Sequence, residues 1–126
     1  MKRFLLAIVF CVAPGLALAD AGDTATVEMF QCELKEGKTM EEVKANNTRW
    51  LAHTRKVTGS EDVNSYAMSP MVGDLTKFMF ADVYPTAAAW ATAKSAAESD
   101  EGQAIEDAFN ELMDCTRNRL YESTQH

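Results

Sequence analysis

Basic residues are scarce in this sequence. Its 126 residues include 12 Lys and Arg against 19 Asp and Glu, which gives a formal net charge of −7 at pH 7. Nucleic acids and anionic membrane surfaces attract proteins through clusters of positive charge. We therefore expect neither a nucleic acid nor an anionic membrane surface as a partner.

Histidine and cysteine are also rare. The chain has two histidines, His53 and His126, and three cysteines. The histidines show no metal-ligand spacing with the cysteines, and no C-x-x-C pair, nucleophile triad, zinc motif or phosphate loop occurs. We therefore expect no metal and no cofactor, and no activity that one of these motifs would specify.

Long hydrophobic runs are absent except at the start of the chain. A basic beginning, MKR, precedes the run FLLAIVFCV, which is too short for a membrane-spanning helix. A proline and a glycine then break the run, and the Ala-Leu-Ala at 17–19 fits a signal-peptidase site. We interpret residues 1–19 as a cleaved signal peptide, with an uncleaved anchor as the alternative. The protein would then be periplasmic or secreted, with no membrane contact after cleavage.

Removal of this segment changes the charge and the cysteine count. Without Lys2 and Arg3, 10 basic residues remain against 19 acidic ones, a net charge of −9. We expect a flexible lead-in at 20–25 and one domain at 26–126, a size that buries a single core. Only Cys32 and Cys115 remain, and in an oxidising compartment such a pair predicts a disulfide. A reactive or metal-binding role is the alternative.

Hydrophobic periodicity predicts six elements. Alternating residues indicate strands at 26–34, 63–72, 77–84 and 115–122. A capping box formed by Thr39 and Glu42 and a 3.6-residue apolar stripe predict a helix at 40–57, which Gly59 and Ser60 end. An alanine-rich helix follows Pro85, is interrupted at 99–102, and resumes with Asp100 as a cap.

The order strand, helix, strand, strand, helix, strand is that of the ferredoxin-like fold. It predicts an α+β domain with a four-stranded antiparallel sheet and helices on one face. The last strand then lies beside the first, so that Cys32 and Cys115 fall on neighbouring strands. The second strand lies at an edge, where Pro70 is tolerated because no partner needs its missing N–H group.

Strand 77–84 is apolar on both sides. Phe78, Phe80 and Tyr84 alternate with Met79, Ala81 and Val83, so we expect both faces of the sheet to be covered. The segments LKEGKTMEE, FMFADVYPTAAAW and ESDEGQA resemble the ferredoxin-like dimeric α/β-barrel superfamily, and the likeness extends over nearly all of 20–126. This resemblance implies a homodimer in which the sheet of a partner subunit covers the second face.

The superfamily includes small monooxygenase-like enzymes, haem-degrading enzymes, stress-responsive dimers and many proteins without an assigned activity. The haem-degrading type relies on an Asn from the first strand and on a Trp and a His from the second half. This chain has Gln31 in the first strand and Trp90 near a matching place, but no histidine between His53 and His126. These departures argue against haem degradation.

Asn47, Trp50 and Trp90 are candidate ligand-binding residues. Asn47 lies within the apolar stripe of helix 40–57, and a buried amide without partners costs about 1–3 kcal/mol. It either faces a ligand cavity between helix and sheet or bonds to a neighbouring backbone group or water. The two tryptophans either line such a pocket or fill the core.

His53 and Asp82 are candidate catalytic groups. His53, at the edge of the helical stripe, is either a base near the mouth of the pocket or an ordinary surface residue. Asp82 interrupts an apolar strand, so its carboxylate must be paired or have a raised pKa. It is either a base or a partner of Arg117 or Arg119 on the last strand. Tyr66 and Tyr84 are candidate hydrogen-bond donors to a ligand.

Three functional hypotheses follow. The leading one is an exported dimer that binds a small, partly apolar molecule in the cleft between helices and sheet. The second is a cofactor-independent monooxygenase-like or isomerase-like enzyme. The third is a structural or interaction module whose function is its dimer surface.

Overall fold

The structure, a computed structural model, describes residues 24–125. The predicted signal peptide at 1–19 lies outside the described residues. The elements in chain order are β1 (Thr24–Leu34), α1 (Met40–Thr58), β2 (Asn64–Met68), β3 (Lys77–Tyr84), α2 (Ala87–Ala96), α3 (Asp100–Leu112) and β4 (Met113–Thr124). Among the described residues, no helix is long and apolar enough to cross a bilayer.

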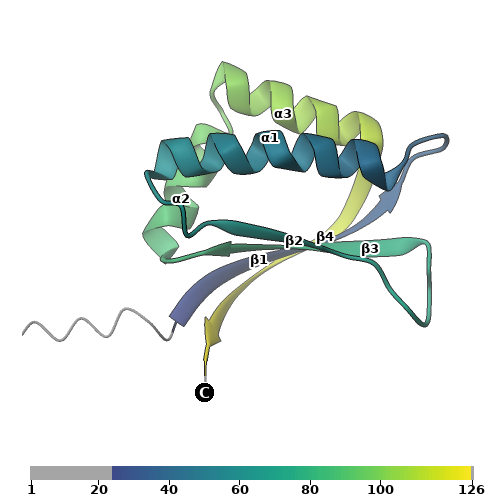
Figure 1. Cartoon of the computed structure of the whole chain (residues 1–126), viewed down its shortest axis with the longest axis horizontal. Helices are drawn as coiled ribbons and strands as arrows, with labels where there is room; N and C mark the ends of the chain where they lie inside the picture. Colours follow the sequence, from purple (N-terminus) through teal and green to yellow (C-terminus); the bar gives the residue numbers. More distant parts are fainter. Residues whose placement is uncertain (1–23, 126) are drawn as a thin grey trace, which may run out of the picture.

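The strands form one antiparallel sheet in the order β2-β3-β1-β4. The helices lie together on one face of this sheet, and residues 24–125 place no helix on the opposite face (Figure 1). The predicted ferredoxin-like α+β fold is therefore confirmed, including the edge position of β2 and the pairing of β4 with β1.

Local sequence signals fix both ends of α1. The Thr39 backbone N–H donates to Glu42 Oε2 at 2.9 Å, and the Glu42 N–H donates to Thr39 Oγ1 at 3.3 Å. This reciprocal pair satisfies two donors that a helix start leaves free. Gly59 ends the helix with φ 65°, a left-handed conformation that glycine adopts without a steric penalty. The predicted capping box and helix end are confirmed.

The junction between α2 and α3 differs from the prediction. The break comes earlier than 99–102, after Ala96, and the N-cap of α3 is Ser99 rather than Asp100. Ser99 Oγ accepts from the Gly102 N–H at 3.1 Å. Gly102 lies inside α3, where an added Cβ would stand 2.4 Å from the Ala96 carbonyl oxygen. Gly102 therefore permits close contact between two helices and does not interrupt one.

The edge strands also differ in length from the prediction. β2 ends at Met68, short of the expected 63–72, and Pro70 follows it closely. β4 runs from Met113 to Thr124 and is longer than the expected 115–122. Its sequence alternates only weakly, but β4 pairs with β1 along its whole length. β1 begins at Thr24, inside the expected flexible lead-in at 20–25, and Thr24 pairs with Thr124.

The core lies between the sheet and the helices. A buried apolar cluster consists of Cys32, Val43, Phe78, Phe80 and Met113. The predicted disulfide between Cys32 and Cys115 is present and joins β1 to β4. It lies where the register of these two strands shifts between Gln31 and Cys32.

The strand register divides the sheet residues into two sets. Phe30 pairs with Phe80 and Glu28 with Asp82 on the helix-covered face, while Val27 pairs with Val83 on the other face. We call the second set the outer face; its residues include Val27, Met29, Gln31, Asn64, Tyr66, Met68, Met79, Ala81, Val83, Arg117, Arg119 and Tyr121. No helix of the described residues covers it (Figure 1).

Candidate functional site

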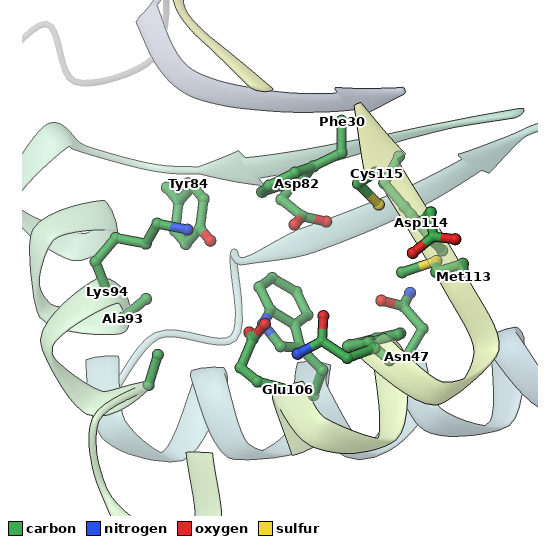
Figure 2. A pocket seen from close by; sticks show the side chains of 15 residues that line it. Phe30, Asn47, Asp82, Tyr84, Ala93, Lys94, Glu106, Met113, Asp114 and Cys115 are labelled. Carbon is green, nitrogen blue, oxygen red and sulfur yellow. The ribbon is translucent and has the colours of Figure 1, made fainter. Parts of the chain in front are cut away.

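A cavity of about 300 Å³ lies between the helices and the sheet. This volume is at the lower end of the range for small-molecule sites. Apolar side chains form much of the wall: Phe30, Trp50, Phe80, Tyr84, Phe109 and Met113. Polar side chains reach the same space: Asn47, Asp82, Lys94, Glu106, Asn110 and Asp114. Figure 2 shows the side chains that surround it, from β1, β3, β4 and all three helices.

Aromatic pairs brace the apolar part of this wall. The ring of Trp50 on α1 meets Tyr84 on β3 edge to face at 6.4 Å between centroids. Phe80 meets Phe109 on α3 in a similar way at 6.3 Å. Such pairs hold their rings in fixed orientations. The apolar part of the cavity wall therefore consists largely of aromatic rings in edge-to-face contact.

Asp82 is the principal polar group of the cavity. It lies in the middle of β3 on the helix-covered face, and only 7% of it is exposed. The Ser65 hydroxyl on β2 donates to Asp82 Oδ1 at 2.6 Å, and Asn47 Nδ2 on α1 donates to Ser65 Oγ at 3.0 Å. A chain of two hydrogen bonds thus links helix α1 to the buried carboxylate.

Burial makes Asp82 a proton acceptor near neutral pH. Loss of solvation raises its pKa to about 7, and the nearby charge of Glu28 adds to the effect. The Ser65 hydrogen bond and the Lys94 ammonium oppose this rise. Burial also raises the pKa of Glu106, which lines the cavity from α3. With its pKa at about 7, Asp82 can gain or lose a proton under physiological conditions.

Glu28 is a buried carboxylate that the sequence analysis missed. It lies opposite Asp82 in the β1–β3 register and is 2% exposed. It accepts hydrogen bonds from Trp90 Nε1 at 3.0 Å and Asn118 Nδ2 at 2.8 Å, and Lys94 Nζ lies 3.0 Å from its Oε2. In an alternating strand, Glu28 lies on the same side as Phe30 and Cys32, and this spacing was the sequence signal that could have indicated its burial. These partners show that Glu28 is a satisfied structural charge.

The structure brings three of the five candidate binding residues together with one candidate catalytic group. Asn47, Trp50, Asp82 and Tyr84 all line the cavity. Two others do not: Tyr66 lies on the outer face with 55% exposure, and the Trp90 indole N–H donates a hydrogen bond to Glu28.

The proposed pairing of Asp82 with an arginine is wrong. Arg117 pairs in register with Gln31 and Arg119 with Met29, which places both arginines on the outer face. Where the register shifts, β4 has one extra residue between Cys115 and Arg117, which turns the arginines to the side opposite Cys115. Ser65, directly opposite Asp82 on β2, takes their place as its partner.

His53 is neither at the cavity nor at the surface. It is 8% exposed, and its Nδ1 lies 3.3 Å from Glu101 Oε2 at the start of α3. It is absent from the cavity wall. The stripe-edge position on α1 that suggested a pocket mouth instead faces the α1–α3 contact. Among residues 24–125, no three His, Cys, Asp or Glu side chains gather as a metal site would require.

No protein-family model matches the chain, and no curated protein matches it by sequence. Solved structures do resemble it. SnoaB, a cofactor-independent oxygenase from Streptomyces nogalater, has a TM-score of 0.60 at 13% identity over 82% of this chain and 96% of that one. A NIPSNAP family protein from Agrobacterium tumefaciens has a TM-score of 0.58 at 20% identity over 79% and 86%. At such identities the likeness shows the ferredoxin-like fold alone.

Proposed function

We propose that the protein binds a small, partly apolar molecule in the helix–sheet cavity. The observation that carries this proposal is the Asp82 carboxylate, nine-tenths buried, on the wall of an aromatic cavity of about 300 Å³. Pockets that bind small molecules combine a mostly apolar lining with a few placed polar groups. This cavity combines an aromatic wall with placed polar groups, although its lining is more polar than that of such pockets.

Stability alone gives no reason for this arrangement. Protein interiors are close-packed, and a cavity costs the contacts that its lining atoms lose. A buried carboxylate without a cationic partner costs further free energy. Both costs fall at the same place, beside Asp82 and Trp50. A ligand that fills the space and contacts the carboxylate would offset both.

Titration of the protein with a panel of small aromatic compounds, followed by amide NMR, tests the proposal. Resonances of α1 and β3 around Trp50 and Asp82 should shift together. Trp50→Ala should weaken binding about tenfold, because a buried aromatic contact is worth about 1–2 kcal/mol. Tyr66→Ala, which removes an aromatic ring from the outer face, is the matched control. A crystal structure with a filled, dry helix–sheet core would remove the proposal.

A second candidate function is a cofactor-independent monooxygenase-like or isomerase-like enzyme. The observation that favours it is the burial of the Asp82 carboxylate on the cavity wall, which raises its pKa to about 7. A base with such a pKa is suited to proton abstraction at neutral pH. Turnover of quinol-like or polyphenol substrates would test it. Activity should be lost in Asp82→Asn and kept in His53→Ala, since His53 lies off the cavity.

We also propose that the protein is a homodimer through its outer face. Met29, Met79, Ala81 and Val83 form an apolar strip on the two central strands, and no helix of the described residues covers it. Val83→Asp should convert a dimer into a monomer in size-exclusion chromatography with light scattering. A monomeric parent protein would contradict the dimer. A dimer that binds no small molecule would favour the third hypothesis, an interaction module.

We propose that this dimer acts outside the cytoplasm. The signal-like pattern at 1–19 and the Cys32–Cys115 disulfide support an exported, oxidised protein. Mass spectrometry of protein recovered from the producing cells should find Asp20 at the N-terminus and no free thiol. Two free thiols would contradict this assignment.

A further inference from the structure

Negative charge predominates on the cavity wall. Asp82, Glu106 and Asp114 reach it, while Lys94 is its one lysine or arginine among residues 24–125. Lys94 Nζ lies 3.0 Å from Glu28 Oε2, so this charge is already paired. Asp114 lies 3.4 Å from Lys35 Nζ. Within the described chain, the Asp82 and Glu106 carboxylates have no basic nitrogen within 4 Å.

Asp82 has fewer hydrogen-bond and charge partners than its neighbour Glu28. Glu28 has partners on both oxygens: Asn118 on Oε1, and Trp90 and Lys94 on Oε2. Asp82 has one hydroxyl donor on Oδ1, and within the described chain no group donates to its Oδ2. Figure 2 shows the Asp82 carboxylate directed into the space between the sheet and the helices. The Oδ2 atom of Asp82 can therefore accept a hydrogen bond or pair with a positive charge from a ligand in the cavity.

The aromatic walls add a second attraction for positive charge. Trp50, Phe80 and Tyr84 line the same cavity as Asp82. The faces of aromatic rings attract cations, most strongly in a site shielded from water. We infer that the cavity selects ligands with a positively charged head and an aromatic or other apolar body, such as aromatic amines, over neutral and anionic molecules of the same shape. This inference rests on the proposed binding function.

The charged groups around Asp82 determine how pH affects such binding. Glu28 faces it from β1, Lys94 from α2 and Glu106 from α3, while α1 contributes only uncharged side chains to this cavity. A bound cation favours the ionised form of Asp82, so binding releases a proton. With the pKa of free Asp82 at about 7, affinity for a permanently charged ligand rises as the pH passes from about 6 to about 8.

Calorimetric titration with three probes of similar size tests the inference: benzyltrimethylammonium, benzyl alcohol and benzoate. We expect the cation to bind about tenfold or more tightly than benzyl alcohol at about pH 8, since the aromatic rings and the ionised Asp82 both attract a cation in this cavity. Benzoate should bind most weakly. Below about pH 6 the advantage of the cation should fall about tenfold, because Asp82 is then neutral and the probe is unchanged.

Two pairs of variants identify the groups responsible. Asp82→Asn should abolish both the preference for the cation and its pH dependence. Glu106→Gln should reduce the preference, whereas Glu111→Gln, on the exposed side of the same helix, should leave it unchanged. If Asp82→Asn fails to fold, the Glu106 and Glu111 pair still tests the inference.

The outcomes separate the two proposals. Benzyl alcohol that shifts cavity resonances and binds as tightly as the cation would overturn the charge selection and leave the binding function intact. If no probe shifts cavity resonances, and a wider aromatic panel also fails, the charge selection and the binding function both fall. Cation binding that Asp82→Asn and Glu106→Gln do not alter would place the probe elsewhere and overturn the inference.

Discussion

Both faces of the sheet carry apolar side chains, but their charged groups differ in position: one is buried at the centre of the helix-covered face, and others lie at the exposed edge of the outer face. On the helix-covered face, Phe80 and Tyr84 flank the buried carboxylate of Asp82. On the outer face, the polar ends of Arg117 and Arg119 lie on the edge strand β4, where its side chains are exposed. An apolar surface with charges at its margin suits a protein interface. An apolar enclosure with a charge at its centre suits a ligand site.

The largest expected effect comes from truncating one side chain on each face. Phe80→Ala should lower the free energy of unfolding by about 3–5 kcal/mol, because Phe80 belongs to the buried apolar cluster and is 4% exposed. Met79→Ala, the neighbour on the outer face, should cost only about 1 kcal/mol in a monomer because Met79 is half-buried. Urea titration measures both. A Met79→Ala cost that grows with protein concentration would show that a partner subunit covers the outer face.

Removal of the disulfide on the helix-covered face should cause the next largest loss in the free energy of unfolding. Cys32 and Cys115 are 83 residues apart, and closing so long a loop stabilises by up to about 4.5 kcal/mol in the chain-entropy model. The double variant Cys32→Ser/Cys115→Ser should lose up to this amount in urea titration. Adding a reductant to the parent should give a similar loss and should not affect the double variant. An unchanged midpoint would contradict the stabilising role.

Asp82→Asn should stabilise the protein at alkaline pH. The folded-state pKa of Asp82 is about 7, while an unfolded aspartate titrates near 3.9. Between these values only the folded state holds the proton, so the parent loses stability as pH rises from about 4 to about 7. The variant avoids this loss and should gain on the order of 2–4 kcal/mol above pH 7. The difference should vanish below about pH 4; a gap independent of pH would contradict the assignment.

The smallest effect should come from Ser65→Ala. The Ser65 hydroxyl donates to Asp82 at 2.6 Å and lowers its pKa against the effect of burial. Its removal should raise the pKa of Asp82 further and cost about 1 kcal/mol of stability. A carboxyl NMR titration measures the first effect. Ser95→Ala, an exposed change on α2, should alter neither. A fall in the pKa of Asp82 would contradict the direction.

Much of the fold was accessible from local sequence signals. The alternation in strand 77–84 assigned Phe80 and Met79 to opposite faces, and the capping box placed the start of α1 correctly. The Cys32–Cys115 pairing followed from strand order. The boundary between α2 and α3 was less accessible, because the place of Gly102 depends on its packing against Ala96, which no local pattern records.

The site was only partly accessible, for a related reason. Asp82 stood out because a carboxylate in an apolar strand violates the local pattern. Glu28 did not stand out, since a glutamate in an alternating strand reads as solvent-facing until its donors are known. Those donors, Trp90 and Asn118, are 62 and 90 residues away along the chain. A role that depends on such distant partners appears only when the chain is folded.

The position of the disulfide also limits how β4 can open. Among the described strands, β4 pairs with β1 alone, so unzipping from the Thr124 side meets no second strand. The covalent link at Cys115 stops that unzipping before it reaches Met113 and Asp114, which form part of the cavity wall. Amide protons of β4 beyond Arg117 should therefore exchange with solvent by local opening. The cavity wall would keep its shape while the rest of the strand frays.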